Sequence, residues 1–387
     1  VSMHSGPELD LGSLGIPVVL CGRPVGGGDS VSYVDADNVE GASKAVTPTA
    51  SGSPVAPPTL ADVARLAGVS SATASRVLTG STRVQPETRD KVEQAMARLG
   101  YVRNRAARAV RARQAGSIAL VLGEENGKVF ADPFFARILW GVNKELGSAD
   151  VQLVLLTLHS PRDYHTVSRY LRSGHVDGAF FVSMHSRPEF DLGGLGIPVV
   201  LCGRPVAGGD SVSYVDADNV EGACKAVNYL LGSGRKAVAT IAGPPDMSPG
   251  IDRLLGYRKA MTAVGVHDPG MIAYGDFSRR AGEHALCRLV DHRPGLDAVF
   301  VASDLMAVGA LSALRRLGRR VPDDVAVLGF DDLPLSQYTD PRLSTVRQPV
   351  DAMAARMVRE MLAQVTTPGQ GPTHVVLDTE LILRDSA

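Results

Sequence analysis

From about residue 117 to its end, the chain alternates short β-rich runs with amphipathic helical stretches. Strands are predicted at Ser117–Leu122, Val151–Thr157, Gly178–Val182, Pro198–Cys202, Ala237–Ala242, Ala298–Ala302 and Val325–Phe330. Helices are predicted between most of them, at Asn219–Leu231, Asp252–Val264, Asp304–Leu317 and Val350–Gln364. Such alternation is typical of parallel sheets covered by helices on both faces.

This segment of about 270 residues exceeds one typical domain, so we expect two lobes with a cleft between them. Ligands of such folds bind in the crevice outside the carboxyl ends of the strands. Polar and aromatic residues fall at those ends, and the candidates there include Phe134, Phe135, Ser303, Asp304 and Asp331.

Residues 59–78 have the pattern of two short helices separated by a glycine turn. Thr59 and Asp62 have the spacing of a capping box, with Asp in place of the usual Glu or Gln. Gly68 is suited to ending the first helix, and Ser70 to capping the second. The apolar stripe of the first helix consists of Leu60, Val63, Ala64 and Ala67.

A third helix is predicted to begin at Pro86 and to stop at Gly100. Its core face consists of Val92, Ala95, Met96 and Leu99. Three short helices on one small core are typical of a DNA-binding head, although the helix pattern alone also fits any small helical bundle.

Charge separates these two interpretations. The whole chain has 40 basic and 41 acidic residues and a net charge of -1. Between residues 59 and 115 the sequence holds eleven basic and four acidic side chains, a local charge of +7, so the remainder carries -8. A basic module on an acidic body indicates that one end of the protein binds phosphates.

The stretches LADVARLAGVSSATASRVLTG and ETRDKVEQAMARLGYVRN, with the arginine-rich segment that follows, resemble the LacI/GalR family of repressors. The resemblance covers roughly residues 59–387. It implies the two-lobed periplasmic-binding-protein fold, with crossings between the lobes near residues 216, 345 and 375. It also implies that the second helix of the head enters the major groove of DNA, and that a hinge helix at about Asn104–Arg111 enters the minor groove.

The resemblance assigns DNA contacts by position. Base edges would face Ser71, Ala72 and Arg76, whereas phosphate contacts or helix capping would fall to Thr59, Ser70, Thr73 and Ser75. The hinge contacts would come from Asn104, Arg105, Ala107, Val110 and Arg111. Because arginine bonds guanine bidentately and Ser and Ala make only weak contacts, we expect Arg76 to carry most of the direct readout.

Two hinge residues depart from the family pattern. Val110 occupies a position that is commonly Leu, and a shorter side chain inserts less apolar surface between base pairs. Arg103 replaces the usual Pro and would add a phosphate contact.

For the effector, the resemblance adds Arg253 as a contact, Phe277 as a stacking platform and Asp331 as the main polar anchor. Arg204 is a further candidate, although Gly203 replaces the family's usual Asp. Carboxylates and guanidinium groups satisfy sugar hydroxyls and phenyl rings pack on sugar faces, so we expect a carbohydrate. Purine-binding relatives place an Arg where this chain has Met247, and a purine effector remains the alternative.

No catalytic constellation, cofactor or metal site is predicted. Residues 123–128 faintly resemble a phosphate loop but have one residue too few between the glycines and no Ser or Thr after the lysine. The nine His show no zinc spacing and the four Cys lie far apart. We find no membrane-spanning run and no signal peptide, so we expect a cytoplasmic protein.

Together these features predict a dimeric transcription regulator, an effector-controlled repressor that binds a pseudo-palindromic operator. The competing interpretation is a sugar-binding carrier without a regulatory role. We assign residues 59–103 to the head, 104–116 to the hinge and linker, and 117–387 to the effector-binding and dimerisation core.

Residues 1–46 repeat residues 182–227 with five differences: Gly6/Arg187, Leu9/Phe190, Ser13/Gly194, Gly26/Ala207 and Ser43/Cys224. The copy predicts a strand at Ile16–Cys21 and the start of a helix cut at Val46. Thr47–Pro58 is rich in Thr, Pro and Ser and predicts a flexible linker. Because the copied strand is separated from its neighbours and cannot bury both of its faces, we expect residues 1–58 to be a poorly packed appendage from a partial duplication or a misplaced start.

Overall fold

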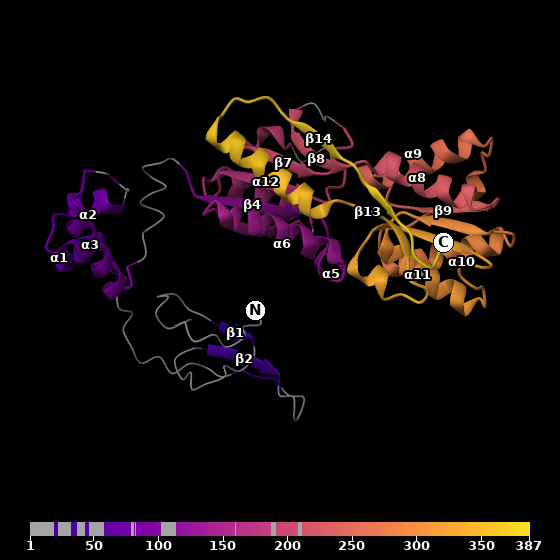
Figure 1. Ribbon diagram of the computed structural model, residues 1–387, viewed down its shortest axis with the longest axis horizontal. Helices are drawn as coiled ribbons and strands as arrows, with labels where there is room; N and C mark the ends of the chain where they lie inside the picture. Colours follow the sequence, from indigo (N-terminus) through magenta and orange to yellow (C-terminus); the bar gives the residue numbers. More distant parts are fainter. Residues whose placement is uncertain are drawn as a thin grey trace. The chain divides into compact units, whose positions relative to one another are not determined.

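The computed structural model describes residues 19–21, 32–36, 43–45, 58–78, 81, 83–101, 114–158, 160–186, 191–207 and 211–387. The chain divides into two compact units, residues 1–104 and 105–387, which are described separately below (Figure 1). Among the described helices, none is both long and apolar enough to cross a membrane.

The head consists of α1 (Leu60–Ala67), α2 (Ser71–Leu78) and α3 (Pro86–Leu99). Thr59 and Asp62 form the predicted capping box at the start of α1. Gly68 and Gly100 end α1 and α3 with φ of 67° and 59°, a left-handed conformation that glycine adopts without a Cβ penalty. The buried core of the head consists of Val63, Ala64, Ala74, Val77, Val92 and Ala95.

The second unit holds two six-stranded sheets, one in each lobe, which confirms the predicted α/β fold class. The first sheet has the order β14 (His374–Leu377), β8 (Ser213–Ala217), β7 (Val199–Cys202), β6 (Gly178–Val182), β4 (Ser117–Leu122) and β5 (Gln152–Thr157). The second has the order β10 (Ile272–Tyr274), β9 (Val238–Ala242), β11 (Ala298–Val301), β12 (Ala326–Asp331), β13 (Ser344–Arg347) and β15 (Glu380–Ile382). The strand pairs of these sheets are parallel apart from β13 with β15.

In the first lobe, α6 (Pro133–Ser148) and α12 (Val350–Thr366) share a buried core with one face of the sheet. The short α5 (Asn126–Ala131) precedes α6, and α7 (Pro161–Arg172) packs with η2 (Gly193–Leu195) on the opposite face. Alternate strand residues divide between the faces: Leu120 and Phe180 lie in one core, and Val121 and Phe181 in the other.

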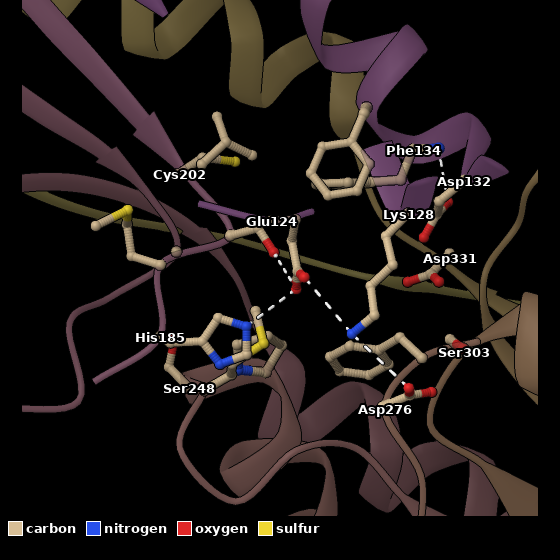
Figure 2. A pocket seen from close by; sticks show the side chains of 18 of the residues that line it. Glu124, Lys128, Asp132, Phe134, His185, Cys202, Ser248, Asp276, Ser303 and Asp331 are labelled. Carbon is tan, nitrogen blue, oxygen red and sulfur yellow. Dashed lines mark hydrogen bonds and ion pairs between the residues drawn. The ribbon is translucent and has the colours of Figure 1, made fainter. Parts of the chain in front are cut away.

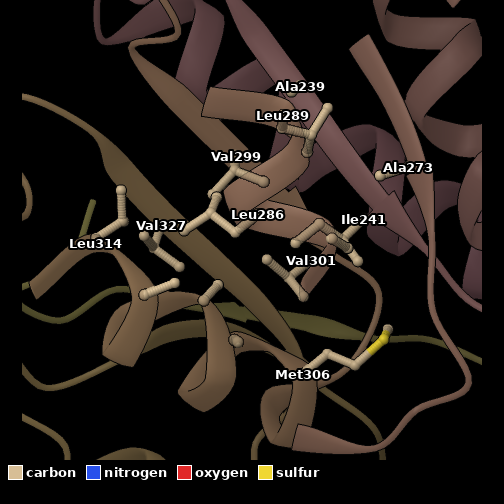
Figure 3. Close-up of a cluster of buried hydrophobic side chains, with 14 of the residues drawn as sticks. Ala239, Ile241, Ala273, Leu286, Leu289, Val299, Val301, Met306, Leu314 and Val327 are labelled. Atoms are coloured by element: carbon tan, nitrogen blue, oxygen red, sulfur yellow. The ribbon is translucent and has the colours of Figure 1, made fainter. Parts of the chain in front are cut away.

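The second lobe has the same layering. Its helices are α8 (Asn219–Gly232) and α9 (Ser248–Ala263) on one face, and α10 (Arg279–His292) and α11 (Asp304–Arg316) on the other. Figure 3 shows the α10–α11 face, where Leu286, Leu289 and Leu314 pack on Val299 and Val327 of the sheet. Short 3₁₀ turns lie at η4 (Pro269–Met271) and η5 (Pro334–Gln337).

The chain passes from the first sheet to the second after Ala217, returns after Arg347 and passes again after Leu377. The seven predicted strands and four predicted helices of this unit are present, although α9 begins at Ser248 rather than at Asp252. Strands β8, β10, β13, β14 and β15 were not predicted, because each is only three to five residues long and lacks a continuous apolar run.

The internal copy forms a small sheet of its own in the order β1 (Val19–Cys21), β2 (Ser32–Ala36) and β3 (Ser43–Ala45). β1 and β2 pair in parallel, with Val19 opposite Ser32. In the core, β7 and β8 pair in the same register, with Val200 opposite Ser213. The copied strands therefore pair in the same register as the originals, although they belong to a separate sheet.

The predicted helix start in the copy is wrong for Ser43–Ala45, which pair antiparallel with β2. The matching residues of the core, 224–226, lie within α8, where they pack against α9 and the second sheet. The copied residues end before α9 begins. Because a helix cut after its first turns is unstable without tertiary packing, the same segment forms a strand.

Candidate DNA-reading head and effector cleft

Helix α2 presents the predicted base-reading residues to solvent. Ala74 and Val77 are buried in the core of the head, whereas Ser71, Ala72 and Arg76 are exposed. The leading face of α2 is therefore accessible to a DNA groove.

Two of the predicted phosphate or capping residues act as helix caps. Thr59 Oγ1 accepts a hydrogen bond from Asp62 N at 3.3 Å and donates one to Asp62 Oδ2 at 2.6 Å. Ser70 Oγ accepts from Thr73 N at 3.1 Å at the start of α2. Ser75 is half-buried on the same helix. The predicted hinge residues Asn104, Arg105, Ala107, Val110 and Arg111 lie outside the described residues.

A cavity of about 930 Å³ lies between the two lobes of the second unit, at the carboxyl ends of their strands (Figure 2). This volume is near the upper end of the range for small-molecule pockets. The structure brings together in its lining the predicted residues Phe134, Phe135, Arg204, Arg253, Phe277, Ser303 and Asp331.

Arg253 lies at the centre of a buried polar network in the second lobe. Its guanidinium donates to Asp331 Oδ1 at 3.1 Å, to the Ala302 carbonyl at 2.6 Å and to Asn219 Oδ1 at 2.9 Å. The same group lies 3.8 Å from the ring centroid of Phe330. Burial lowers the pKa of Arg253. The network therefore holds a desolvated cation and its carboxylate partner at the cavity wall.

Asp331 reaches the cavity through an unusual backbone conformation at the end of β12. Its φ of 116° is rare for a residue with a Cβ, and such strain is typical of functional sites. Gln348 Nε2 donates to Asp331 Oδ1 at 2.7 Å. Burial raises the pKa of Asp331, opposed by Arg253. Phe277, with φ of 68°, lies at the cavity wall 5.9 Å from the Arg253 guanidinium.

The prediction for Asp304 needs correction, because this residue does not line the cavity. Its side chain is fully buried, and its carboxylate accepts hydrogen bonds from Thr345 Oγ1 at 2.5 Å and from Leu333 N at 2.8 Å. Asp304 thus supports the turn that follows β12. Its neighbour Ser303 caps α11 through a bond from Met306 N at 3.2 Å while facing the cavity.

Asp132 is a cavity residue that precedes the predicted Phe134 and Phe135 in the sequence and was not itself predicted. Its Oδ1 accepts from Phe134 N at 2.9 Å at the start of α6. Burial, followed by the negative charge of Asp331, raises the pKa of Asp132 to about 6. A carboxyl group with a pKa raised to about 6 therefore faces the cavity.

Arg204 lines the cavity and joins the two lobes. Its Nε donates to Asp252 Oδ2 at 2.7 Å, and its Nη2 pairs with the other carboxylate oxygen. Its backbone N donates at 3.0 Å to Asp216 Oδ2, whose pKa is raised by burial. Asp216 also accepts from Asn219 Nδ2 at 3.0 Å.

Sequence reasoning missed several cavity residues: Glu124, Lys128, His185, Asp216, Asn219 and Gln348. Asp216 and Gln348 lie at the ends of strands that were not predicted. Glu124 and Lys128 belong to the segment that resembled a phosphate loop, and its position after the first strand was the available signal. Among the described residues, no group of His, Cys, Asp or Glu is arranged to hold a metal ion.

The cavity combines aromatic rings with buried acceptors and donors from both lobes. Phenyl faces pack on C–H groups, while carboxylates, amides and a guanidinium bond hydroxyl groups. The arrangement is suited to an uncharged ligand with many hydroxyl groups.

Comparison with known families agrees with this two-part organisation. Residues 59–104 match the bacterial regulatory proteins of the lacI family, and residues 227–387 match the periplasmic binding protein-like domain. The solved structure of the transcriptional regulator CelR–cellobiose complex aligns with a TM-score of 0.68 and 42% identity, covering 85% of this chain and all of that chain. A lac repressor dimer bound to operator and the anti-inducer ONPF aligns with a TM-score of 0.76 and 25% identity, covering 85% and 99%.

Two relatives align with the chain over nearly their whole length. The chain is 43% identical over 333 residues to the HTH-type transcriptional regulator CelR of Thermobifida fusca, covering 85% of this chain and 98% of CelR. It is 33% identical over 335 residues to the HTH-type transcriptional repressor CytR of Escherichia coli (strain K12), covering 85% and 96%. The chain therefore belongs to the LacI family of bacterial transcription regulators.

Proposed function

We propose that this protein is a repressor whose affinity for operator DNA is controlled by a β-linked disaccharide of the cellobiose type. The observation that carries the proposal is the inter-lobe cavity, where the buried Arg253–Asp331 pair shares the wall with the rings of Phe134 and Phe277. A cavity of about 930 Å³ has room for more than one sugar ring. The similarity to a regulator solved with cellobiose supports this choice of ligand.

In the proposed mechanism the protein acts as a cytoplasmic homodimer without catalytic activity. Two heads bind the two halves of a pseudo-palindromic operator, since a two-fold protein reads two-fold DNA. The sugar binds between the lobes and changes the population of a DNA-binding arrangement. Coupling of this kind requires different sugar affinities in the two arrangements, typically about 1–3 kcal/mol.

The test is the fluorescence anisotropy of labelled DNA from upstream of the protein's own gene, titrated with the full chain. We expect affinity to fall steeply with salt, because bound phosphates release counterions, and to change when cellobiose is added. Maltose serves as the matched disaccharide control, and adenosine tests the purine alternative. Operator affinity that is insensitive to salt would refute the DNA-binding part, and insensitivity to cellobiose would refute the proposed effector.

A further inference from the structure

Among the described residues, three pairs of a basic and an acidic side chain cross the effector cleft, each with its basic side chain on the first lobe and its carboxylate on the second; the His185 pair is ionic when the ring is protonated. They are Arg204 with Asp252, His185 Nδ1 with Asp246 Oδ2 at 2.8 Å, and Lys128 Nζ with Asp276 Oδ2 at 3.8 Å. All three cationic side chains line the cavity. The two cleft walls are therefore electrostatically complementary when they meet.

One carboxylate of the first lobe, Glu124, contacts both Lys128 and His185. Glu124 follows β4 and is 7% exposed. Its Oε1 lies 3.2 Å from His185 Nε2 and accepts from Ser183 Oγ at 3.2 Å, while its Oε2 lies 3.6 Å from Lys128 Nζ (Figure 2). Because Glu124 belongs to the same lobe as both cations, these contacts persist when the lobes separate.

The backbone next to His185 also joins the lobes. Ser186 N donates to the carbonyl oxygen of Asp246 at 2.8 Å, beside the contact between the His185 ring and the Asp246 carboxylate. Asp246 thus meets the first lobe through both its main chain and its side chain. Opening the cleft breaks both contacts.

We propose that Lys128, His185 and Arg204 are positioning residues that hold the two lobes closed over the effector, through carboxylates of the second lobe. The inference rests on the proposed function, because it concerns the same cleft. A ligand that binds the closed form has an apparent affinity in proportion to the closed fraction. Each pair therefore raises effector affinity by increasing the closed fraction, in addition to any contact that its cavity-lining side chain makes.

His185 makes this closure sensitive to pH. Its ring faces Glu124 from the segment after β4 and Asp246 from the loop after β9, with Lys128 and Asp276 beyond Glu124. The hydrogen bond to Glu124 and the one to Asp246 raise the pKa of His185, against the opposing effect of burial. Opening removes Asp246 and the more distant Asp276 but leaves Glu124 in place, so the protonated ring favours the closed form. Closure is then favoured at low pH and weakened as the pH rises through the pKa of His185 in the closed state.

The first experiment needs no sugar. The full chain carrying ¹³C-labelled histidine is titrated by NMR, and His185→Gln identifies the His185 signal. We expect a pKa above the ordinary 6.5 in the wild type and a lower value in Asp246→Asn. An identical titration in both proteins would overturn the contact on which the proposal depends.

The second experiment is a double-mutant cycle measured by calorimetric titration with cellobiose. Lys128→Gln and Asp276→Asn should each weaken binding about two- to fivefold, and the double variant should be no weaker than either single one. Lys259→Gln is the matched control, because it breaks a 3.2 Å pair with Glu221 that lies within the second lobe. Fully additive losses, or an equal loss in the control, would refute the proposed role.

The third experiment tests pH in an Asp132→Asn background, which removes a cavity carboxyl group whose pKa is raised to about 6. Cellobiose affinity should fall from pH 6 to pH 8 when His185 is present and stay constant in His185→Gln. A difference of one pKa unit between the open and closed states corresponds to at most a tenfold change. A slope that survives His185→Gln would refute the proposal. If wild type binds no cellobiose, the proposed effector fails while the NMR titration still decides the contact.

Discussion

Asp132 should make the protein less stable than it would be with asparagine at the same position. Its folded-state pKa of about 6 lies about two units above the ordinary value of 3.8, which corresponds to about 3 kcal/mol between the charged and neutral forms. Because the folded state binds the proton more tightly, stability is lost as the pH rises from about 4 to about 6. Above that pH range, the charged Asp132 carboxylate lowers the free energy of unfolding by the full amount of about 3 kcal/mol.

Asp132→Asn should remove this cost while keeping the helix cap. Asparagine is as good an N-cap as aspartate, so the bond from Phe134 N is retained. We expect the free energy of unfolding to rise by about 1.5 kcal/mol at pH 5 and by up to about 3 kcal/mol at pH 7.5. The same substitution should alter effector affinity, since Asp132 lines the cavity.

Urea unfolding of the core, followed by circular dichroism at both pH values, measures this difference. Asp191→Asn, at an exposed aspartate of the same lobe, controls for the loss of one negative charge. A stabilisation by Asp132→Asn that is the same at pH 5 and pH 7.5 would show that the pKa of Asp132 is not raised. A loss of stability at both pH values would refute the reasoning altogether.

Three further predictions concern the head, the buried network and the internal copy. Asp331→Ala leaves the buried Arg253 cation without its carboxylate and should lower the unfolding free energy by about 3–5 kcal/mol; urea unfolding that matches wild type would contradict this. Arg76→Ala should cost about 1–3 kcal/mol of operator discrimination in competition anisotropy and leave cellobiose binding unchanged; equal damage to both would argue against separate sites. Deletion of residues 1–58 should leave the effector-induced change in operator affinity intact, because the described strands of the copy pair only with one another; loss of that response would assign the copy a role.

The fold was largely predictable because its signals are local. Capping residues, glycine stops and the spacing of apolar side chains lie within a few residues of the elements that they define. Thr59, Gly68 and Gly100 behave as their sequence context predicts. The short strand β8 escaped prediction because it is stabilised by its neighbours β7 and β14 rather than by its own pattern.

The cleft was only partly predictable. Asp304 and Asp331 both occur where a strand ends, so their sequence positions do not distinguish them. Only the structure turns Asp304 inward to Thr345 and Leu333, while the backbone of Asp331 directs its carboxylate to Arg253 and Gln348 at the cavity. The contacts between His185 and Asp246 join segments from different lobes, which no local pattern encodes.

The duplicated segment shows, within one chain, which features the local sequence determines and which depend on tertiary packing. Its sequence alone determines the parallel pairing of Val19–Cys21 with Ser32–Ala36, since the same register recurs in β7 and β8. Tertiary structure decides the state of the residues that follow, which form a strand at Ser43–Ala45 and a helix at 224–226. The difference arises because a helix face must be buried against partners, and the copied sequence does not carry them.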